Sequence, residues 1–191
     1  MEKRSESKKK THDLILTKTS LLLDKKGFLN VSSKDIAKEC NVSQGSIFLH
    51  FKTKENLLNT ILLSHINDYE NALKNSLLPN LKSNVFLKKY LDILIENEIF
   101  LSRAYKDFAH LSKKLIKNLE DLEIVTKDLF FENIRQVKKN EFNIIDSFIS
   151  IDAFLSQIYK NLIEKDVFTK SNSIIRQRRG KIIKLYRILF E

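Results

Sequence analysis

The sequence predicts an all-α fold, and three observations carry that prediction. The 191 residues include only three glycines and one proline, so the turn residues that hairpins and glycine-rich loops require are scarce. Apolar side chains recur at intervals of three and four residues along long stretches of the chain, which is the period of an amphipathic helix. Serines precede some of these stretches, at positions where helix N-caps are expected. The length suits a small module joined to one larger domain.

The composition of the chain excludes several protein classes. Cys40 is the single cysteine, so no intrachain disulfide can form, and a reducing compartment is expected. The apolar runs are far shorter than the ~20 residues of a bilayer span, and no signal-peptide core follows the charged N-terminus. We therefore expect a soluble, cytoplasmic protein. The net charge of +10, of which +5 falls within residues 1–60, favours a polyanionic partner, either nucleic acid or anionic lipid.

The N-terminal third of the chain divides into short helical segments. Residues 1–8 lack an apolar anchor and are expected to form a flexible basic arm. Helical spacing then continues to Gly27, which is a suitable C-terminal stop. Second and third helices are expected over residues 33–40 and from Gln44 to about His50, followed by a longer helix from Lys54. Short helices joined by a connection of ~3 residues have the geometry of a helix-turn-helix.

The remaining chain contains longer helical segments that are rich in aromatic residues. Pro79, the lone proline, is expected to end the fourth helix and marks a domain boundary. Further helices are expected over residues 84–102, 104–111, 114–139, 143–165 and 172–190. The predicted organisation is therefore an arm (1–8), a helix-turn-helix domain (9–53), a connecting helix (54–78) and a larger helical domain (79–191).

Residues 30–58 read NVSSKDIAKECNVSQGSIFLHFKTKENLL, and this stretch resembles the DNA-binding domain of TetR-type transcriptional regulators. The resemblance begins at Ile15, includes Gly27 and Phe28 before the second helix, and covers about the first 62 residues. The remainder is similar to the family in length and helical character. The resemblance implies a DNA-binding helix-turn-helix followed by a helical domain for ligand binding and dimerisation.

Each matched position in the motif has a physical reason. Gly45, near the start of the third helix, lets the backbone approach DNA or the preceding helix, which explains a residue that costs ~1 kcal/mol against alanine in a helix. Ala37 is small because the two helices must cross closely. The positions spaced to form the small core between the helices are Ile36, Ala37, Val42, Ile47 and Phe51.

The third helix is expected to enter the major groove, which admits one helix and presents chemically distinct base edges. Gln44, Ser46 and Leu49 are the candidates for base contact. Glutamine can pair bidentately with adenine, and a projecting leucine can meet a thymine methyl group. The alternative for each residue is a capping role or simple exposure to solvent.

Phosphate contacts are expected around the same helices. Lys54 begins the fourth helix, where its cation and the helix N-terminal N–H groups can hold a phosphate, as the resemblance also implies. His50 occupies the family's phosphate-contacting position. Phe48 stands where the family usually has a tyrosine, so one phosphate-contacting hydroxyl is lost while the packing is kept. The full candidate set is Ser33, Ser43, His50, Lys52 and Lys54.

The aromatic residues of the C-terminal domain are expected to be mostly core. The resemblance implies that a few line an apolar ligand cavity, for which the candidates are Phe86, Tyr90, Phe100, Tyr105, Phe108 and Phe131. It also implies that the last two helices form a four-helix bundle with a second subunit; the alternative is burial in a monomer core. The candidates for this dimer interface are Phe148, Leu155, Tyr159, Ile175, Ile182 and Tyr186.

Charged residues of the C-terminal domain also carry expectations. Arg178 and Arg179 interrupt the apolar stripe of the last helix, and are expected to reach water or to pair across the interface with Asp146, Asp152 or Glu164. Carboxylate pairs such as Glu96/Glu98 and Glu120/Asp121 are interpreted as solvated faces. The four histidines and Cys40 lack paired ligand spacing, and no glycine-rich phosphate loop is found. We therefore expect no catalytic residues, no metal, no cofactor and no enzyme activity.

The sequence thus predicts a sequence-specific DNA-binding transcriptional regulator, a ligand-responsive repressor that acts as a homodimer on a palindromic operator. The expected partners are double-stranded DNA, a second copy of the chain and a small-molecule effector, with no membrane. One alternative is a constitutive DNA-binding protein without a ligand. Another is a basic helical enzyme or a membrane-surface protein, against which the N-terminal motif argues.

Overall fold

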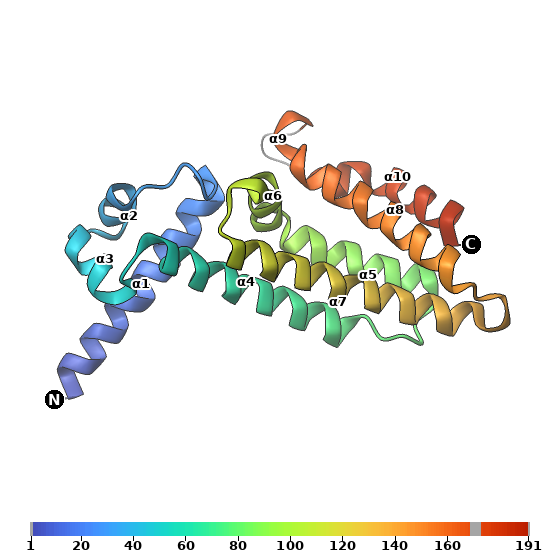
Figure 1. The fold of residues 1–191 in the computed structure, drawn as a ribbon, viewed down its shortest axis with the longest axis horizontal. Coiled ribbons are helices and arrows are strands. Elements are labelled where there is room, and N and C mark those ends of the chain that lie inside the picture. The colour runs from blue at the N-terminus through green and yellow to red at the C-terminus, as the bar shows by residue number, and fades with distance from the viewer. Residues whose placement is uncertain (1, 169–172, 191) are drawn as a thin grey trace.

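The computed structural model describes residues 2–168 and 173–190, and these residues form helices and no strand. The all-α prediction is confirmed. Short helices gather at the N-terminal end of the molecule and a bundle of longer helices at the other, with α4 running between them (Figure 1). The helices are α1 (Glu2–Lys26), α2 (Ser33–Cys40), α3 (Gln44–Phe51), α4 (Lys54–Ser76), α5 (Ser83–Glu96), α6 (Glu98–Lys106), α7 (Lys113–Lys138), α8 (Ile144–Ile163), α9 (Lys165–Phe168) and α10 (Ile174–Phe190), with 3₁₀ turns η1 (Phe108–His110) and η2 (Lys139–Glu141).

Side-chain caps set the limits of α2 and α3. The Ser32 hydroxyl accepts the Asp35 N–H, and the Asp35 carboxylate accepts the Ser32 N–H at 3.0 Å, so α2 begins with a capping box. The helix ends where Asn41 takes a left-handed conformation with φ +54°. Ser43 then caps α3 by accepting the Ser46 N–H at 3.1 Å. Both helices therefore lie within one residue of their predicted limits.

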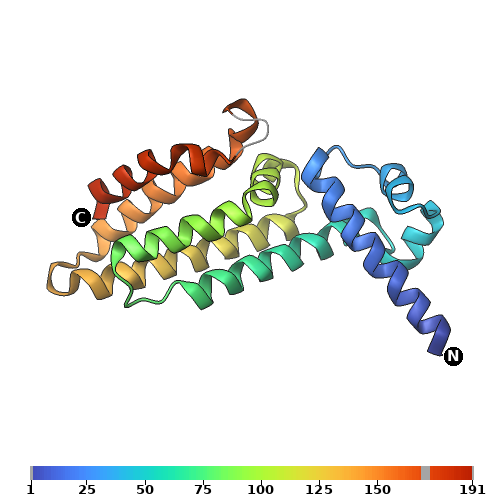
Figure 2. The same cartoon turned by 180° about the vertical axis from the view of Figure 1, so that it is seen from behind.

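The first helix begins earlier than the sequence predicted. Residues 2–8 are helical and belong to α1, where the sequence analysis expected an arm outside the first helix, and Met1 lies outside the described residues. Lys, Glu and Arg are good helix formers, and Glu6 and Lys10 pair one turn apart at 2.8 Å. From residue 5 onward the first buried side chain is Ile15. The N-terminal turns of α1 project beyond the short helices (Figures 1 and 2).

α4 connects the two parts of the molecule. It begins at Lys54, as predicted, and Pro79 lies in the loop that follows it. The side-chain amide of Asn133, on α7, donates to the carbonyl oxygens of Pro79 and Leu81 at 2.9 and 2.8 Å. The loop between α4 and α5 is thus held by a side chain more than fifty residues away.

An aromatic cluster around Phe130 of α7 forms the centre of the C-terminal bundle. The Phe130 ring lies 5.0 and 4.9 Å from the rings of Phe86 and Tyr90 on α5, 5.6 Å from Phe154 on α8 and 6.4 Å from Tyr186 on α10. Each of the five side chains is at most 1% exposed. Aromatic pairs of this kind add ~0.5–1.5 kcal/mol each beyond their burial. Four helices therefore share one core.

The single helix predicted over residues 84–102 is two helices, α5 and α6. They are separated at Asn97, whose side-chain amide donates to the Ile93 carbonyl oxygen at 2.9 Å. The change of direction lets α6 pack against α1 and α8. The helix predicted over 104–111 is likewise divided between the end of α6 and η1. Apolar spacing continues through both turns, so periodicity alone did not reveal them.

Glu98 is buried, which corrects the interpretation of the Glu96/Glu98 pair as a solvated face. Its side chain is 2% exposed, and its carboxylate accepts the Ile174 N–H at 2.8 Å, the Ile175 N–H at 3.4 Å and the Ser173 hydroxyl. These N–H groups belong to the first turn of α10, where a helix leaves its donors without partners. A carboxylate from α6 therefore caps α10, while Glu96 is exposed as predicted.

Candidate nucleic-acid interface

A small apolar core holds α2 against α3. Ile36 of α2 and Ile47 of α3 are at most 1% exposed, and Ala37 and Phe51 are buried beside them. Val42, in the connection, packs against this core, and its N–H donates to the Ala37 carbonyl oxygen at 3.0 Å. Because α3 buries one side in this core, its opposite side faces solvent in a fixed orientation.

The three predicted base-contacting residues lie on α3, and none of them is buried. Gln44 is exposed, Ser46 is half-buried and Leu49 is 74% exposed. Phe48, beside Leu49, is 45% exposed. The chain itself leaves these two large apolar side chains uncovered on a helix of eight residues. An amide and an apolar group on one exposed helix match the hydrogen-bonding edges and methyl groups of a major groove.

The predicted phosphate-contacting residues lie at the ends of the short helices. Ser33 is half-buried in the first turn of α2, Ser43 caps α3, and Lys52 is exposed directly after α3. The Lys54 ammonium donates to the Val31 carbonyl oxygen at 3.0 Å. Lys54 therefore fastens the loop before α2 to the start of α4, in addition to its position at a helix N-terminus.

His50 lies at the C-terminal end of α3, next to α1. The centre of its ring is 6.0 Å from that of His12, and the His12 ring stacks on Phe51 at 4.7 Å. Burial, followed by the nearby His12 and Lys8, lowers the pKa of His50. A neutral imidazole at pH 7 follows, and a phosphate close to it would favour the protonated form. His12 was not among the sequence candidates, because its contacts come from α3, which is distant in the chain.

Packing within the chain does not require a glycine at position 45. A Cβ atom at this position would lie 3.7 Å from the Ser43 Oγ, which is an ordinary van der Waals contact. The preceding helix therefore does not require glycine here. Of the two reasons that the sequence suggested, the close approach of DNA is the one still open.

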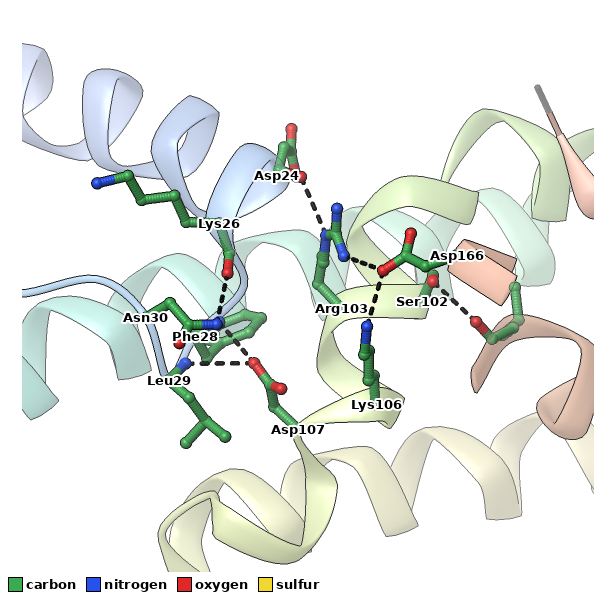
Figure 3. A network of polar contacts seen from close by, with 11 residues as sticks. Asp24, Lys26, Phe28, Leu29, Asn30, Ser102, Arg103, Lys106, Asp107 and Asp166 are labelled. Atoms are coloured by element: carbon green, nitrogen blue, oxygen red, sulfur yellow. Dashed lines mark hydrogen bonds and ion pairs between the residues drawn. The ribbon is translucent and has the colours of Figure 1, made fainter. Parts of the chain in front are cut away.

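Asp107 joins the N-terminal helices to the C-terminal bundle (Figure 3). One oxygen of its buried carboxylate accepts the Phe28 N–H at 2.7 Å and the Leu29 N–H at 3.2 Å. Gly27 has φ +79°, and a Cβ atom there would lie 2.9 Å from the same Asp107 oxygen. Glycine is thus required both for the left-handed backbone and for space. The sequence indicated Gly27 as a helix stop, but nothing in it pointed to Asp107.

Arg103 of α6 is the centre of a second set of contacts at the same junction (Figure 3). Its Nε donates to the Asp24 carbonyl oxygen at 3.1 Å, and its guanidinium lies 2.5 Å from the Asp166 carboxylate. Lys106 also pairs with Asp166 at 2.8 Å. The hydrogen bond from Lys106, together with the charge of Arg103, lowers the pKa of Asp166. α6 is therefore bonded to α1 and to α9 at once.

The six residues predicted to line a ligand cavity lie in different places. Phe86 and Tyr90 belong to the aromatic core, and the Phe100 ring stacks on His65 of α4 at 4.1 Å, at the junction between the two parts. Phe131 packs instead on Phe142 and Phe148, at the far end of α7. Tyr105 is buried and Phe108 half-buried. The structure does not gather these six side chains around one space.

A surface hollow of about 580 Å³ lies elsewhere, beside the cap of α10. It is lined by Ile95, Glu98, Ile99, Lys165, Ser173, Arg176 and Gln177. None of the six predicted cavity residues contributes to this lining.

Most of the residues predicted to form a dimer interface are covered by their own protomer. Leu155, Ile175, Ile182 and Tyr186 are at most 2% exposed, so they offer no surface to a second subunit. Tyr159 is half-buried and stacks on Tyr105 at 4.8 Å. Of the six, Phe148 is the exposed one, at 47%. The error has a simple cause: α8 and α10 are apolar on two sides, and the sequence did not show which side faces inward.

The two arginines of α10 also have partners other than those predicted. Arg179 pairs with Asp92 of α5 at 2.8 Å, and Arg178 donates to the Asn161 side chain at 2.5 Å. The Arg178 guanidinium also lies 4.2 Å from the centre of the Phe168 ring. Both side chains are therefore engaged within one protomer.

Membrane-spanning helices and metal clusters are absent from the part of the chain that the structure describes. Within residues 2–168 and 173–190, none of the helices combines the length and the apolar character needed to cross a bilayer. The same residues contain no cluster of three or more His, Cys, Asp or Glu side chains suited to a metal ion. Cys40 is a buried free thiol, and burial raises its pKa.

Comparison with known proteins agrees with this geometry. Residues 15–61 match the family model of bacterial regulatory proteins of the tetR family. The uncharacterized HTH-type transcriptional regulator YerO of Bacillus subtilis is 43% identical over 61 residues, which are 31% of this chain and 21% of YerO. HTH-type transcriptional regulator SAR0097 of Staphylococcus aureus is 25% identical over 193 residues, covering 97% of this chain and 96% of that protein.

The fold is similar to that of solved regulators. The TetR-family transcriptional regulator PfmR from Thermus thermophilus matches with a TM-score of 0.69 at 20% identity, covering 91% of this chain and 97% of PfmR. At this identity the likeness shows the fold alone. The chain spans between 21% and 52% of the length of three Bacillus subtilis relatives that it matches.

Proposed function

We propose that the chain is a sequence-specific DNA-binding transcriptional regulator of the TetR family that acts in the cytoplasm, since residues 15–61 match the model of that family. The observation that carries the proposal is the outer side of α3. Gln44, in the first turn, and Leu49 are exposed, while Ile47 and Phe51 are buried in the core shared with α2. In this proposal Gln44, Ser46 and Leu49 contact base edges, and Ser33, Ser43, His50, Lys52 and Lys54 contact phosphates.

The proposed regulator is a homodimer. The support is a set of exposed apolar side chains on α8 and α10, since a monomer rarely leaves a large apolar patch uncovered. Its members, between 47% and 71% exposed, are Ile144, Ile145, Phe148 and Ile149 of α8 and Ile188 of α10. A two-fold dimer would bind a palindromic operator with half-site centres ~34–36 Å apart or a multiple of that distance. A monomeric mass by light scattering at micromolar concentration would contradict this.

The proposed regulator is also a repressor whose DNA affinity changes with a small-molecule effector. An effector acts only through its different affinity for two conformations. The contacts of α6 with both α1 and α9 supply a connection that such a change could alter. The alternative is a constitutive DNA-binding protein, and the burial of Phe86 and Tyr90 in a packed core favours it. A thermal-shift screen separates the two, because an effector would raise the Tm.

The DNA-binding proposal is tested with a duplex obtained by selection from random sequences. Gln44→Ala is expected to cost ~1–3 kcal/mol on the selected duplex and to leave binding to a scrambled duplex unchanged, since base contacts carry discrimination. Lys52→Ala is expected to weaken both complexes and to reduce the salt slope by about one unit for each phosphate that the variant no longer neutralises. Lys52 is exposed, so this substitution removes charge without disturbing packing.

Lys54→Ala is a less clean probe, because its ammonium also bonds the Val31 carbonyl oxygen. It is expected to weaken binding to both duplexes and to lower the Tm. Equal weakening of selected and scrambled duplexes by Gln44→Ala would show that α3 does not read bases. Failure of the selection to enrich any sequence would contradict sequence-specific binding itself.

A further inference from the structure

Residues 5–10 of α1 have no packing role in the part of the chain that the structure describes. Side chains 5–10 are all exposed, and the first buried side chain after them is Ile15. A helical turn without tertiary contacts gains little stability in water, because most helical stability in proteins comes from packing. The turns nevertheless project past the short helices (Figures 1 and 2). They carry three consecutive lysines, Lys8, Lys9 and Lys10.

The orientation of these turns is fixed by His12. Its ring stacks on Phe51 of α3 and lies 6.0 Å from the ring of His50, so this face of α1 is turned toward the C-terminal end of α3. Lys8 precedes His12 by four residues and lies on the same helix face, one turn further out. The effect of Lys8 on the pKa of His50 agrees with this placement.

Lys10, two residues after Lys8, lies on another side of α1. Successive residues are rotated by about 100° around a helix, so Lys10 lies on a different face from Lys8. Its ammonium pairs with Glu6 at 2.8 Å. Lys8 therefore lies on the side of α1 that faces α3, whereas Lys10 is already paired with Glu6.

The surface beside His12 and His50 is suited to an anion. A hollow of about 420 Å³ lies there, and Lys52 and Lys114 supply cations to its lining. None of its lining residues is a carboxylate. A polyanion that follows the C-terminal end of α3 would meet these groups and then Lys8.

We propose that the N-terminal turns of α1 are a second DNA-contacting element, in which Lys8 binds a backbone phosphate outside the base pairs that α3 covers. The inference rests on the proposed DNA-binding function and adds a contact to it. Lys8 is a positively charged donor for phosphodiester oxygens and reads no bases, so it contributes to affinity and not to discrimination. The turn between His12 and Lys8 is about 6 Å long, which is comparable to the rise of two base pairs.

The test compares Lys8→Gln with Lys10→Gln on the selected duplex over a range of salt concentrations. Lys8→Gln is expected to reduce the slope of log K against log salt by about 0.9 for each phosphate that Lys8 neutralises. If the affinity extrapolated to 1 M salt is unchanged, this equals about an eightfold weakening per phosphate at 0.1 M salt. Lys10→Gln is expected to leave slope and affinity unchanged, and Lys8→Arg to retain both. Circular dichroism should give equal helicity and Tm for all variants, since both side chains are exposed.

A shortened duplex locates the bound phosphate. Removing the outermost flanking base pairs should weaken binding of the unmodified chain and of Lys10→Gln, but should not weaken Lys8→Gln further. Equal salt slopes for Lys8→Gln and the unmodified chain would overturn the inference while leaving the proposed function intact. Failure of the unmodified chain to bind any duplex would overturn both.

Discussion

The N-terminal helices and the C-terminal bundle use apolar residues in different ways. α3 buries Ile47 and Phe51 on one side and leaves Phe48 and Leu49 exposed on the other. α5 buries six of its fourteen residues, from Phe86 to Leu94, on a broad face that packs against α4, α7 and α10. On a helix that buries only one narrow face, an exposed apolar side chain therefore indicates a surface that binds a partner. On a helix whose broad apolar face packs against several neighbouring helices, a buried apolar side chain reports packing and says little about ligands.

One helix of the bundle has a cap of a kind not seen in α2 and α3. α2 and α3 are capped by Ser32 and Ser43, which adjoin the helices they cap. α10 has an adjoining cap too, Ser173, but its first N–H groups also donate to Glu98, which lies on another helix. Removal of Ser32 or Ser43 should therefore have a local effect, and removal of Glu98 a long-range effect. Substitutions in the two parts examine this difference, from the largest expected effect to the smallest.

Phe86→Ala is expected to have the largest effect, a loss of ~3–5 kcal/mol in the free energy of unfolding. The side chain is fully buried against Phe130, so its removal leaves a cavity in the aromatic core. Urea unfolding measures the change. Phe131→Ala, at a half-buried position of α7, is the control and should cost less. A loss below about 1 kcal/mol for Phe86→Ala would indicate loose packing there and would favour the ligand-cavity interpretation.

Glu98→Ala is expected to cost about 3 kcal/mol, because it leaves buried N–H groups of α10 without an acceptor. Glu96→Ala, two residues away and exposed, should stay within about 0.5 kcal/mol. Both variants should keep the DNA affinity of the unmodified chain if they remain folded. Similar unfolding free energies for the two variants would show that the Glu98 cap contributes nothing.

Glu123→Gln is expected to have a smaller effect than Phe86→Ala and Glu98→Ala, with a size that depends on pH. Burial raises the pKa of Glu123 above its ordinary value of 4.5, so the folded state favours the protonated form. Its contribution to stability is therefore lost as pH rises through the folded pKa. Glu123→Gln should raise the Tm slightly at pH 7 and leave it unchanged below about pH 4. A lower Tm at pH 7 would contradict the prediction.

Asp35→Asn provides the contrast from the N-terminal part. Hydrogen bonds from Ser32 and Lys26 hold the pKa of Asp35 well below its ordinary value of 3.8. Its stabilising contribution is present above that value and is lost as pH falls through the folded pKa. Asp35→Asn should therefore lower the Tm at pH 7, with a difference that shrinks in acid. The two carboxylates should thus give opposite changes when the Tm is followed against pH.

The sequence by itself determined the elements whose causes are local. The limits of α2 and α3 follow from caps and turn residues within a few positions, and the core between them follows from the spacing of Ile36, Ala37 and Ile47. Once that core is known, the exposed residues of α3 are known too, because a short helix that buries one face leaves its remaining residues exposed. The helicity of residues 2–8 was missed, since charge without an apolar anchor was taken as a sign of disorder although these residues favour a helix.

The tertiary structure alone decided the contacts that join distant segments. Asp107 bonds the backbone of Phe28 from 79 residues away, and Glu98 caps Ile174 from 76 residues away. A carboxylate has many permitted roles, and its role depends on which donors the fold brings within about 3 Å. The inward sides of α8 and α10 were undecided for the same reason. Both sides are apolar, and the neighbouring helices choose which one is buried.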